Sequence, residues 1–75
     1  MSSVSHIFYV SDALDQSQRV QLQYVFNQLN SVHSANFDRR RKHLLAVAYD
    51  PDQLSSKDLL GIFLQNGVRA NTLHY

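Results

Sequence analysis

The sequence predicts an α+β fold, a two-layer sandwich with the element order βαββαβ. Three observations predict it. Four short segments are rich in β-branched and aromatic residues, which is typical of strands. Two longer segments carry apolar residues at helical spacing. With 75 residues, 44% of them hydrophobic, the chain can build one thin core, so both helices must bury their apolar stripes against the same sheet.

The first half of the chain is expected to form a strand, a helix and a second strand. The strands cover residues 6–10 and 32–38, and the helix covers residues 15–30. Asp15 and Gln18 form a capping-box pattern, in which the carboxylate accepts a backbone N–H and the amide reaches back to the N-cap. The apolar positions on one face of this helix are Leu22, Val25, Phe26 and Leu29.

The second half begins with a strand over residues 43–49, which ends where a proline follows, because proline cannot donate to a strand ladder. A second capping-box pattern, Ser55 with Asp58, opens a helix over residues 55–66. Its apolar face is formed by Leu59, Ile62 and Phe63. Gly67 is suited to end the helix, because glycine adopts the left-handed conformation without strain.

A last strand over residues 68–73 completes the order, and the economical arrangement is a ferredoxin-like topology. Right-handed crossovers then give an antiparallel sheet with the strand order 4-1-3-2. We expect a single domain over residues 1–75. No apolar stretch approaches the ~20 residues of a membrane helix, and no signal-peptide pattern is visible, so we expect a cytoplasmic protein without membrane insertion.

The second half also carries turn and cap residues in a particular order. They are Tyr49, Asp50, Pro51, Ser55, Leu59, Gly67 and Ala70. This order resembles the heavy-metal-associated domain, the small module of copper chaperones and of the cytoplasmic tails of metal-pumping ATPases. The resemblance covers nearly everything from His6 to His74 and implies the same ferredoxin-like fold. Val68 replaces the aromatic residue that is usual in the family.

The resemblance also places the family's metal-binding loop, Gly-Met-Thr-Cys-x-x-Cys, on residues 12–18. The two thiolate positions are Asp15 and Gln18 here, and the chain contains no cysteine. Copper(I) is a soft ion that prefers sulfur, whereas a carboxylate and an amide offer hard oxygens. Two oxygens on a solvated loop are also too few for calcium or magnesium. We therefore expect no soft metal and no cofactor, and we interpret both residues as a helix cap.

Four histidines are the remaining candidate metal ligands. In the predicted topology His6 lies beside His74 at one end of the sheet, His33 is two strands away from His6, and His43 is at the opposite end. The His6–His74 pair would bind zinc, nickel or copper(II) weakly and would need a third ligand or a second chain. The alternative is that both rings are partly exposed and share no ligand.

A basic turn separates the second and third strands. It consists of Arg39, Arg40, Arg41 and Lys42. Such a turn attracts an acidic partner, a phosphate or a nucleic acid, but a solvated hairpin tip is the alternative. The net charge of +1 falls short of the basic footprint of nucleic-acid-binding domains. The RNA-recognition fold shares this topology, but only Tyr9 is placed to stack a base. We expect no nucleic-acid partner and retain RNA binding as an alternative.

The most informative feature is the sheet face that the helices leave uncovered, because such a face is ordinarily polar. Alternation along the strands places six apolar side chains there: Ile7, Tyr9, Leu44, Ala46, Ala48 and Leu73. An apolar patch of several hundred Å² on a small domain is a candidate contact surface for a protein partner or a homodimer. The alternative is a mildly apolar face that needs no partner, and a one-residue register slip would remove the patch.

No catalytic arrangement stands out, because the chain has no serine elbow, no zinc-hydrolase motif and no glycine-rich phosphate loop. We therefore expect a non-enzymatic domain that has lost soft-metal ligation and acts as a protein-interaction or regulatory module. An association with metal transport rests on the resemblance alone. The alternatives are a histidine-dependent carrier of zinc, nickel or copper(II), and an RNA-binding module.

Overall fold

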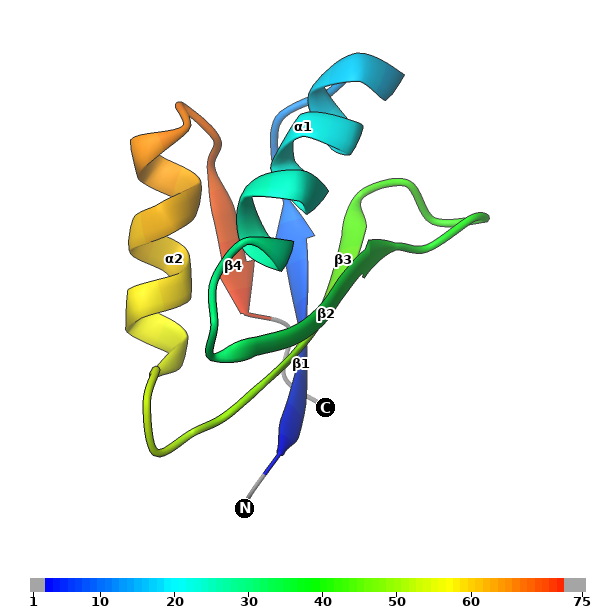
Figure 1. The fold of residues 1–75 in the computed structure, drawn as a ribbon. Helices are drawn as coiled ribbons and strands as arrows, with labels where there is room; N and C mark the ends of the chain where they lie inside the picture. The colour runs from blue at the N-terminus through cyan, green and yellow to red at the C-terminus, as the bar shows by residue number, and fades with distance from the viewer. Residues whose placement is uncertain (1–2, 73–75) are drawn as a thin grey trace.

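The computed structural model describes residues 3–72, which form a four-stranded antiparallel sheet and two helices (Figure 1). The elements are β1 (Val4–Val10), α1 (Gln16–Asn27), β2 (Val32–Phe37), β3 (Leu44–Tyr49), α2 (Ser56–Gln65) and β4 (Ala70–Thr72). The strand order is β2-β3-β1-β4. This confirms the predicted βαββαβ ferredoxin-like sandwich, whose predicted order 4-1-3-2 is the same order counted from the other edge.

Both helices begin where the sequence predicts, because both capping boxes form. The Asp15 carboxylate accepts from the Gln18 backbone N–H at 2.8 Å, and the Gln18 amide oxygen accepts from the Asp15 N–H at 3.0 Å. Ser55 and Asp58 make the equivalent pair at α2, with distances of 2.9 and 3.3 Å. Each cap satisfies backbone donors that have no partner within the helix.

Three predicted boundaries are wrong by two residues or more. β1 begins at Val4 rather than residue 6, because its ladder with β3 continues to Val4. α1 ends at Asn27 rather than residue 30, because the chain tightens there: the Leu29 N–H donates to the Phe26 carbonyl, a bond with the shorter spacing of a 3₁₀ turn. β4 begins at Ala70 rather than residue 68. The Val68 N–H instead donates to the Phe63 carbonyl at 2.9 Å, closing the end of α2 around Gly67, whose φ is +72°.

The core lies between the helices and one face of the sheet (Figure 1). The central strands supply Phe8, Val10, Leu45, Val47 and Tyr49, as alternation predicts, and the helices add Leu22, Phe26, Leu59 and Phe63. The Phe63 ring joins the two helices to the sheet, because its centroid is 4.8 Å from that of Phe26 and 5.3 Å from that of Phe8. Since these residues are buried on the inner face, their neighbours in sequence must face outward.

The free edge of β2 is covered by side chains from α1. The Asn27 amide both accepts from the Ala35 N–H and donates to the Ala35 carbonyl, each at 3.1 Å. The Gln23 side-chain oxygen accepts from the Phe37 N–H at 2.7 Å. These amides pair with backbone groups that an added strand would use, so this edge is protected against strand addition. The outer face of the sheet, by contrast, is covered by neither helix (Figure 1).

Candidate functional site

The outer face of the sheet is apolar along its two central strands. Antiparallel pairing sets Ile7 opposite Ala46 and Tyr9 opposite Leu44, so their side chains share one face. We call the described members of this patch the outer face: Ile7, Tyr9, Leu44, Ala46 and Ala48. Neither α1 nor α2 covers them, because both helices pack on the opposite side (Figure 1). The register therefore excludes the one-residue slip, while the predicted member Leu73 lies outside the described residues.

The two edge strands give this face a polar rim. Ser34 and Asn36 on β2 pair with Ala48 and Ala46, and Asn71 on β4 pairs with Tyr9. The Tyr9 side chain is 43% exposed, and Ala46 is exposed as well. An apolar centre inside a polar rim is the usual anatomy of a protein contact surface.

The basic turn between β2 and β3 is shaped by Asp38. Its carboxylate accepts from the backbone N–H groups of Arg40 and Arg41 at 2.8 and 2.9 Å. These two hydrogen bonds, first that from Arg41, hold the pKa of Asp38 below its usual range. The Leu44 N–H then donates to the Arg41 carbonyl at 2.9 Å and closes the turn. The backbone of the turn is thus fixed from within, while the basic side chains remain exposed.

The basic turn and the outer face meet at an open hollow of about 590 Å³. Its lining consists of Tyr9, Arg40, Arg41, Lys42, His43 and Leu44. The rings of Tyr9 and His43 lie 5.9 Å apart, centroid to centroid, at an interplanar angle of 30°. Arg39 instead borders a separate depression beside α1, with Phe37 and Asp38. The basic turn is therefore divided, because Arg40 and Arg41 border the hollow and Arg39 does not. The hollow also includes His43, which the sequence placed only at one end of the sheet.

His6 lies on the other side of the sheet, beside the core. Its Nδ1 and the Tyr49 hydroxyl are 3.1 Å apart, and the two rings meet edge to face with centroids 5.6 Å apart. Burial raises the pKa of the Tyr49 phenol, so the hydroxyl stays protonated and needs a polar partner. His6 supplies that partner, which sequence reasoning missed. His74 lies outside the described residues.

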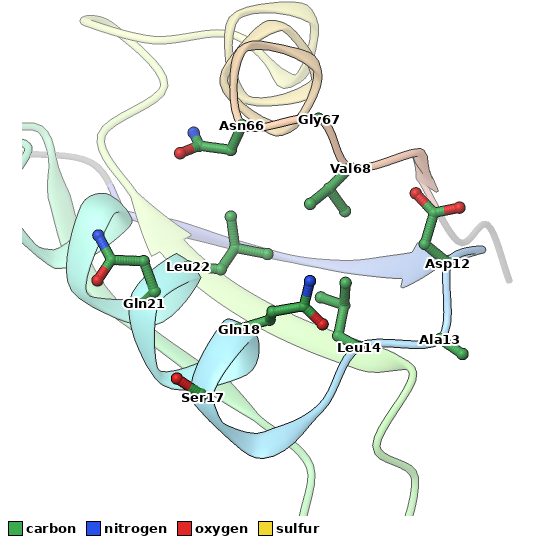
Figure 2. Close-up of a pocket in the computed structure, with 10 residues that line it drawn as sticks. All are labelled: Asp12, Ala13, Leu14, Ser17, Gln18, Gln21, Leu22, Asn66, Gly67 and Val68. Atoms are coloured by element: carbon green, nitrogen blue, oxygen red, sulfur yellow. The ribbon is translucent and has the colours of Figure 1, made fainter.

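The turn between β1 and α1 is held by its own polar side chains. The Asp12 carboxylate accepts from the Arg69 N–H at 2.9 Å, which ties the turn to the segment before β4. The oxygens of Asp15 and Gln18 accept from each other's backbone N–H groups. Figure 2 shows Leu14 and Val68 between this turn and the end of α2, where they help to line an open hollow of about 580 Å³.

No protein-family model matches the sequence, and no curated protein matches it either. Solved structures do match over almost the whole chain. Oxidized MerP from Ralstonia metallidurans aligns with a TM-score of 0.85 and 10% identity, covering 97% of this chain and all of its own. A copper binding domain from HMA7, a P-type ATPase, aligns with a TM-score of 0.82 and 16% identity, covering 93% of both chains. The CopZ metallochaperone aligns with a TM-score of 0.79 and 15% identity, covering 91% of this chain and 100% of its own. The chain has the fold of a heavy-metal-associated domain.

This heavy-metal-associated fold lacks the thiol ligands that the resemblance associates with its first turn. The chain contains no cysteine, and the oxygens of Asp15 and Gln18 are already hydrogen-bonded within the capping box. The residues present do not fit copper(I), which prefers sulfur. Within residues 3–72, no group of three or more histidine and acidic side chains comes together to hold a metal ion. No helix in that range is long and apolar enough to cross a membrane.

Proposed function

We propose that this chain is a non-enzymatic protein-interaction or regulatory module, which uses the outer face to bind a protein partner. The observation that carries the proposal is the apolar surface formed by the Ile7–Ala46 and Tyr9–Leu44 pairs on the side of the sheet opposite both helices. Burying such a surface against a partner releases water from apolar side chains and stabilises the complex. Its polar rim keeps the free domain compatible with water.

The chemistry of the first turn supports an interaction role over a metal-carrying one. The positions that would hold a thiophilic ion carry oxygens, and these oxygens stabilise the start of α1. His6, the described member of the candidate histidine pair, is engaged with the buried Tyr49 hydroxyl. Releasing it to bind zinc, nickel or copper(II) would leave a buried polar group without its partner, which disfavours that alternative.

A partner of different sequence fits the outer face better than a second copy does. The chain has six acidic residues, all aspartates at positions 12, 15, 38, 50, 52 and 58, and none is a member of the outer face or of its rim. A second copy would bring another basic turn and no carboxylate from its own outer face. Two of the similar solved structures are a metallochaperone and an ATPase domain, which supports a place in the cytoplasm beside a metal-transport system.

The test compares two aspartate variants, Ala46→Asp in the outer face and Val20→Asp on the exposed side of α1. Both residues are exposed, so both variants should fold. We expect partner proteins captured by the wild-type chain from its own cell extract to be retained by Val20→Asp and lost by Ala46→Asp. Binding of the purified partner to all three proteins, measured by calorimetry, then has to follow the same order.

Equal binding of the partner by Ala46→Asp and wild-type protein would contradict the use of the outer face. Sedimentation equilibrium of the purified wild-type chain shows whether a second copy of the chain, rather than a different protein, binds the outer face. A dimer that dissociates in Ala46→Asp but persists in Val20→Asp would show that a second copy covers this face, contrary to the proposal of a different partner.

A further inference from the structure

We infer that the hollow beside the basic turn is the anchor point of the outer face, and that it binds an acidic segment of a protein partner with one apolar side chain. This inference rests on the proposed function and names the chemistry of the partner. It follows from the meeting of two surfaces at one corner of the sheet. The lining combines an aromatic pair, Tyr9 with His43, with the exposed cations of Arg40, Arg41 and Lys42.

The apolar part of the hollow suits a side chain rather than a small polar ligand. Tyr9 and Leu44 face each other across β1 and β3, and the His43 ring packs beside Tyr9. The Val10 N–H donates to the His43 carbonyl at 2.8 Å, so the backbone that carries His43 is fixed to β1. Aromatic side chains held on strands present apolar area at little cost in conformational entropy, which is a property of interface anchors.

The charged part of the hollow selects an acidic partner. The lining residues of the hollow include no acidic side chain. The nearby Asp38 carboxylate is occupied by the Arg40 and Arg41 backbone N–H groups. The guanidinium groups of Arg40 and Arg41 are exposed at its border, and they are suited to paired hydrogen bonds with carboxylates. Because the turn is closed by its own backbone, binding would not have to order it first.

A protein segment fits this corner better than single-stranded RNA. RNA-binding sheets stack successive bases on aromatic side chains of the central strands. Beyond the Tyr9–His43 pair, the outer face offers only aliphatic side chains, which provide no further stacking surface. The aliphatic part of the outer face adjoins a hollow that is aromatic and cationic. This combination suits a peptide with acidic residues beside an apolar one.

The test begins with random dodecapeptides displayed on phage and selected on the immobilised wild-type chain. We expect the selected peptides to be enriched in Asp and Glu next to an aromatic or large aliphatic residue. The best peptide is then synthesised and titrated into wild-type, Arg41→Glu and Lys57→Glu proteins. The two variants have the same net charge, but Lys57 lies on α2, away from the hollow. We expect Arg41→Glu to bind about tenfold more weakly and Lys57→Glu to bind like the wild type.

Amide chemical shifts should change at Tyr9, His43 and Leu44 when the peptide binds, and affinity should fall as salt is raised. Selection of no peptides, or of peptides without acidic bias, would overturn the inference, as would equal weakening in both variants. If oligouridine bound at the same residues more tightly than the peptide does, the ligand of the hollow would be RNA rather than a protein segment. Each of these failures leaves the Ala46→Asp test of the proposed function standing, because that test does not depend on the basic turn.

Discussion

Two turns lie at the same end of the sheet, and they use their polar side chains in opposite ways. In the β1–α1 turn, Asp12, Asp15 and Gln18 direct their oxygens to backbone N–H groups. In the β2–β3 turn, Asp38 alone does so, and the neighbouring cations remain exposed. The side-chain oxygens of the first turn therefore stabilise the fold, whereas the cationic side chains of the second turn remain free to contact a partner.

The difference between the two turns indicates which part of this fold is available for function. The fold alone directs attention to the first turn, because a copper binding domain of a P-type ATPase shares the architecture. Side-chain chemistry directs it to the other turn and the adjoining outer face. A helix N-terminus needs acceptors, so oxygens placed there are readily explained by capping. Arginine side chains have no such role at a turn that is already closed by a carboxylate.

The largest expected effect is a gain of copper(I) binding when thiols replace the oxygens of the first turn. The double variant Asp15→Cys/Gln18→Cys places two thiols three residues apart at the start of α1, where the helix dipole favours thiolates. We expect one copper(I) per chain to be held against a chelator that strips the wild-type protein completely. Anaerobic titration with a chromogenic copper(I) chelator measures this.

The single variant Asp15→Cys is the matched control, because one thiol gives only one soft ligand. It should lose the ion to the chelator. Retention of copper(I) by the wild-type chain, with shifts of the Asp15 and Gln18 amide signals, would contradict the contrast between the two turns, since it would show that oxygen ligands suffice in the first one.

The next effect is on stability. Asp15→Ala removes the side chain that caps α1 and should lower the free energy of unfolding by about 1 kcal/mol, within the usual range of about 0.5–2 for a lost cap. Asp15→Asn retains an acceptor and should cost only a few tenths. Ser55→Ala, at the equivalent position of α2, should match Asp15→Ala. Urea unfolding followed by circular dichroism measures all three, and an unchanged midpoint for Asp15→Ala would show that the cap is not needed.

The local features of this fold were predictable from the sequence because they depend on neighbours in the chain. Both capping boxes, the outward alternation of Ile7 and Tyr9, and the left-handed Gly67 follow from patterns of a few residues. One of the boundary errors concerns Val68, whose apolar character suits a strand as well as the end of a helix. Its backbone N–H donates to the Phe63 carbonyl, and strand or helix propensity does not predict which of the two structures Val68 joins.

Contacts between distant segments were not predictable in the same way. The Tyr9–His43 pair requires the β1–β3 register, and the His6–Tyr49 hydrogen bond requires knowing which phenol is buried. The α1 amides that cover the β2 edge depend on the position of the helix over the sheet, as Asn27 shows. The candidate site could therefore be predicted as a patch of residues, but its corner hollow became visible only with the packing.

A smaller effect is expected when a cation of the second turn is removed. Arg41→Ala leaves the backbone N–H that Asp38 accepts, so the turn should persist and the free energy of unfolding should change by less than about 0.5 kcal/mol. Urea unfolding checks this against the wild type. A larger loss of unfolding free energy would mean that the Arg41 side chain stabilises the fold. The polar side chains of both turns would then have the same structural role.

The smallest effect is a local response to acid at Asp38. Its pKa is lowered in the folded chain, so the stabilisation it provides is present above the pKa of the unfolded chain and is lost as the pH falls through the folded value. The amide signals of Arg40 and Arg41 should therefore shift together as the pH is lowered below the ordinary pKa of an aspartate, while the rest of β2 and β3 stays unchanged. Asp38→Asn is the control, because its amide has no carboxylate to protonate and those two signals should not titrate. If these two signals stayed constant in the wild type, the Asp38 carboxylate would not be the group that fixes the turn. The exposed arginines would then not be carried by a backbone that is ordered before a partner binds.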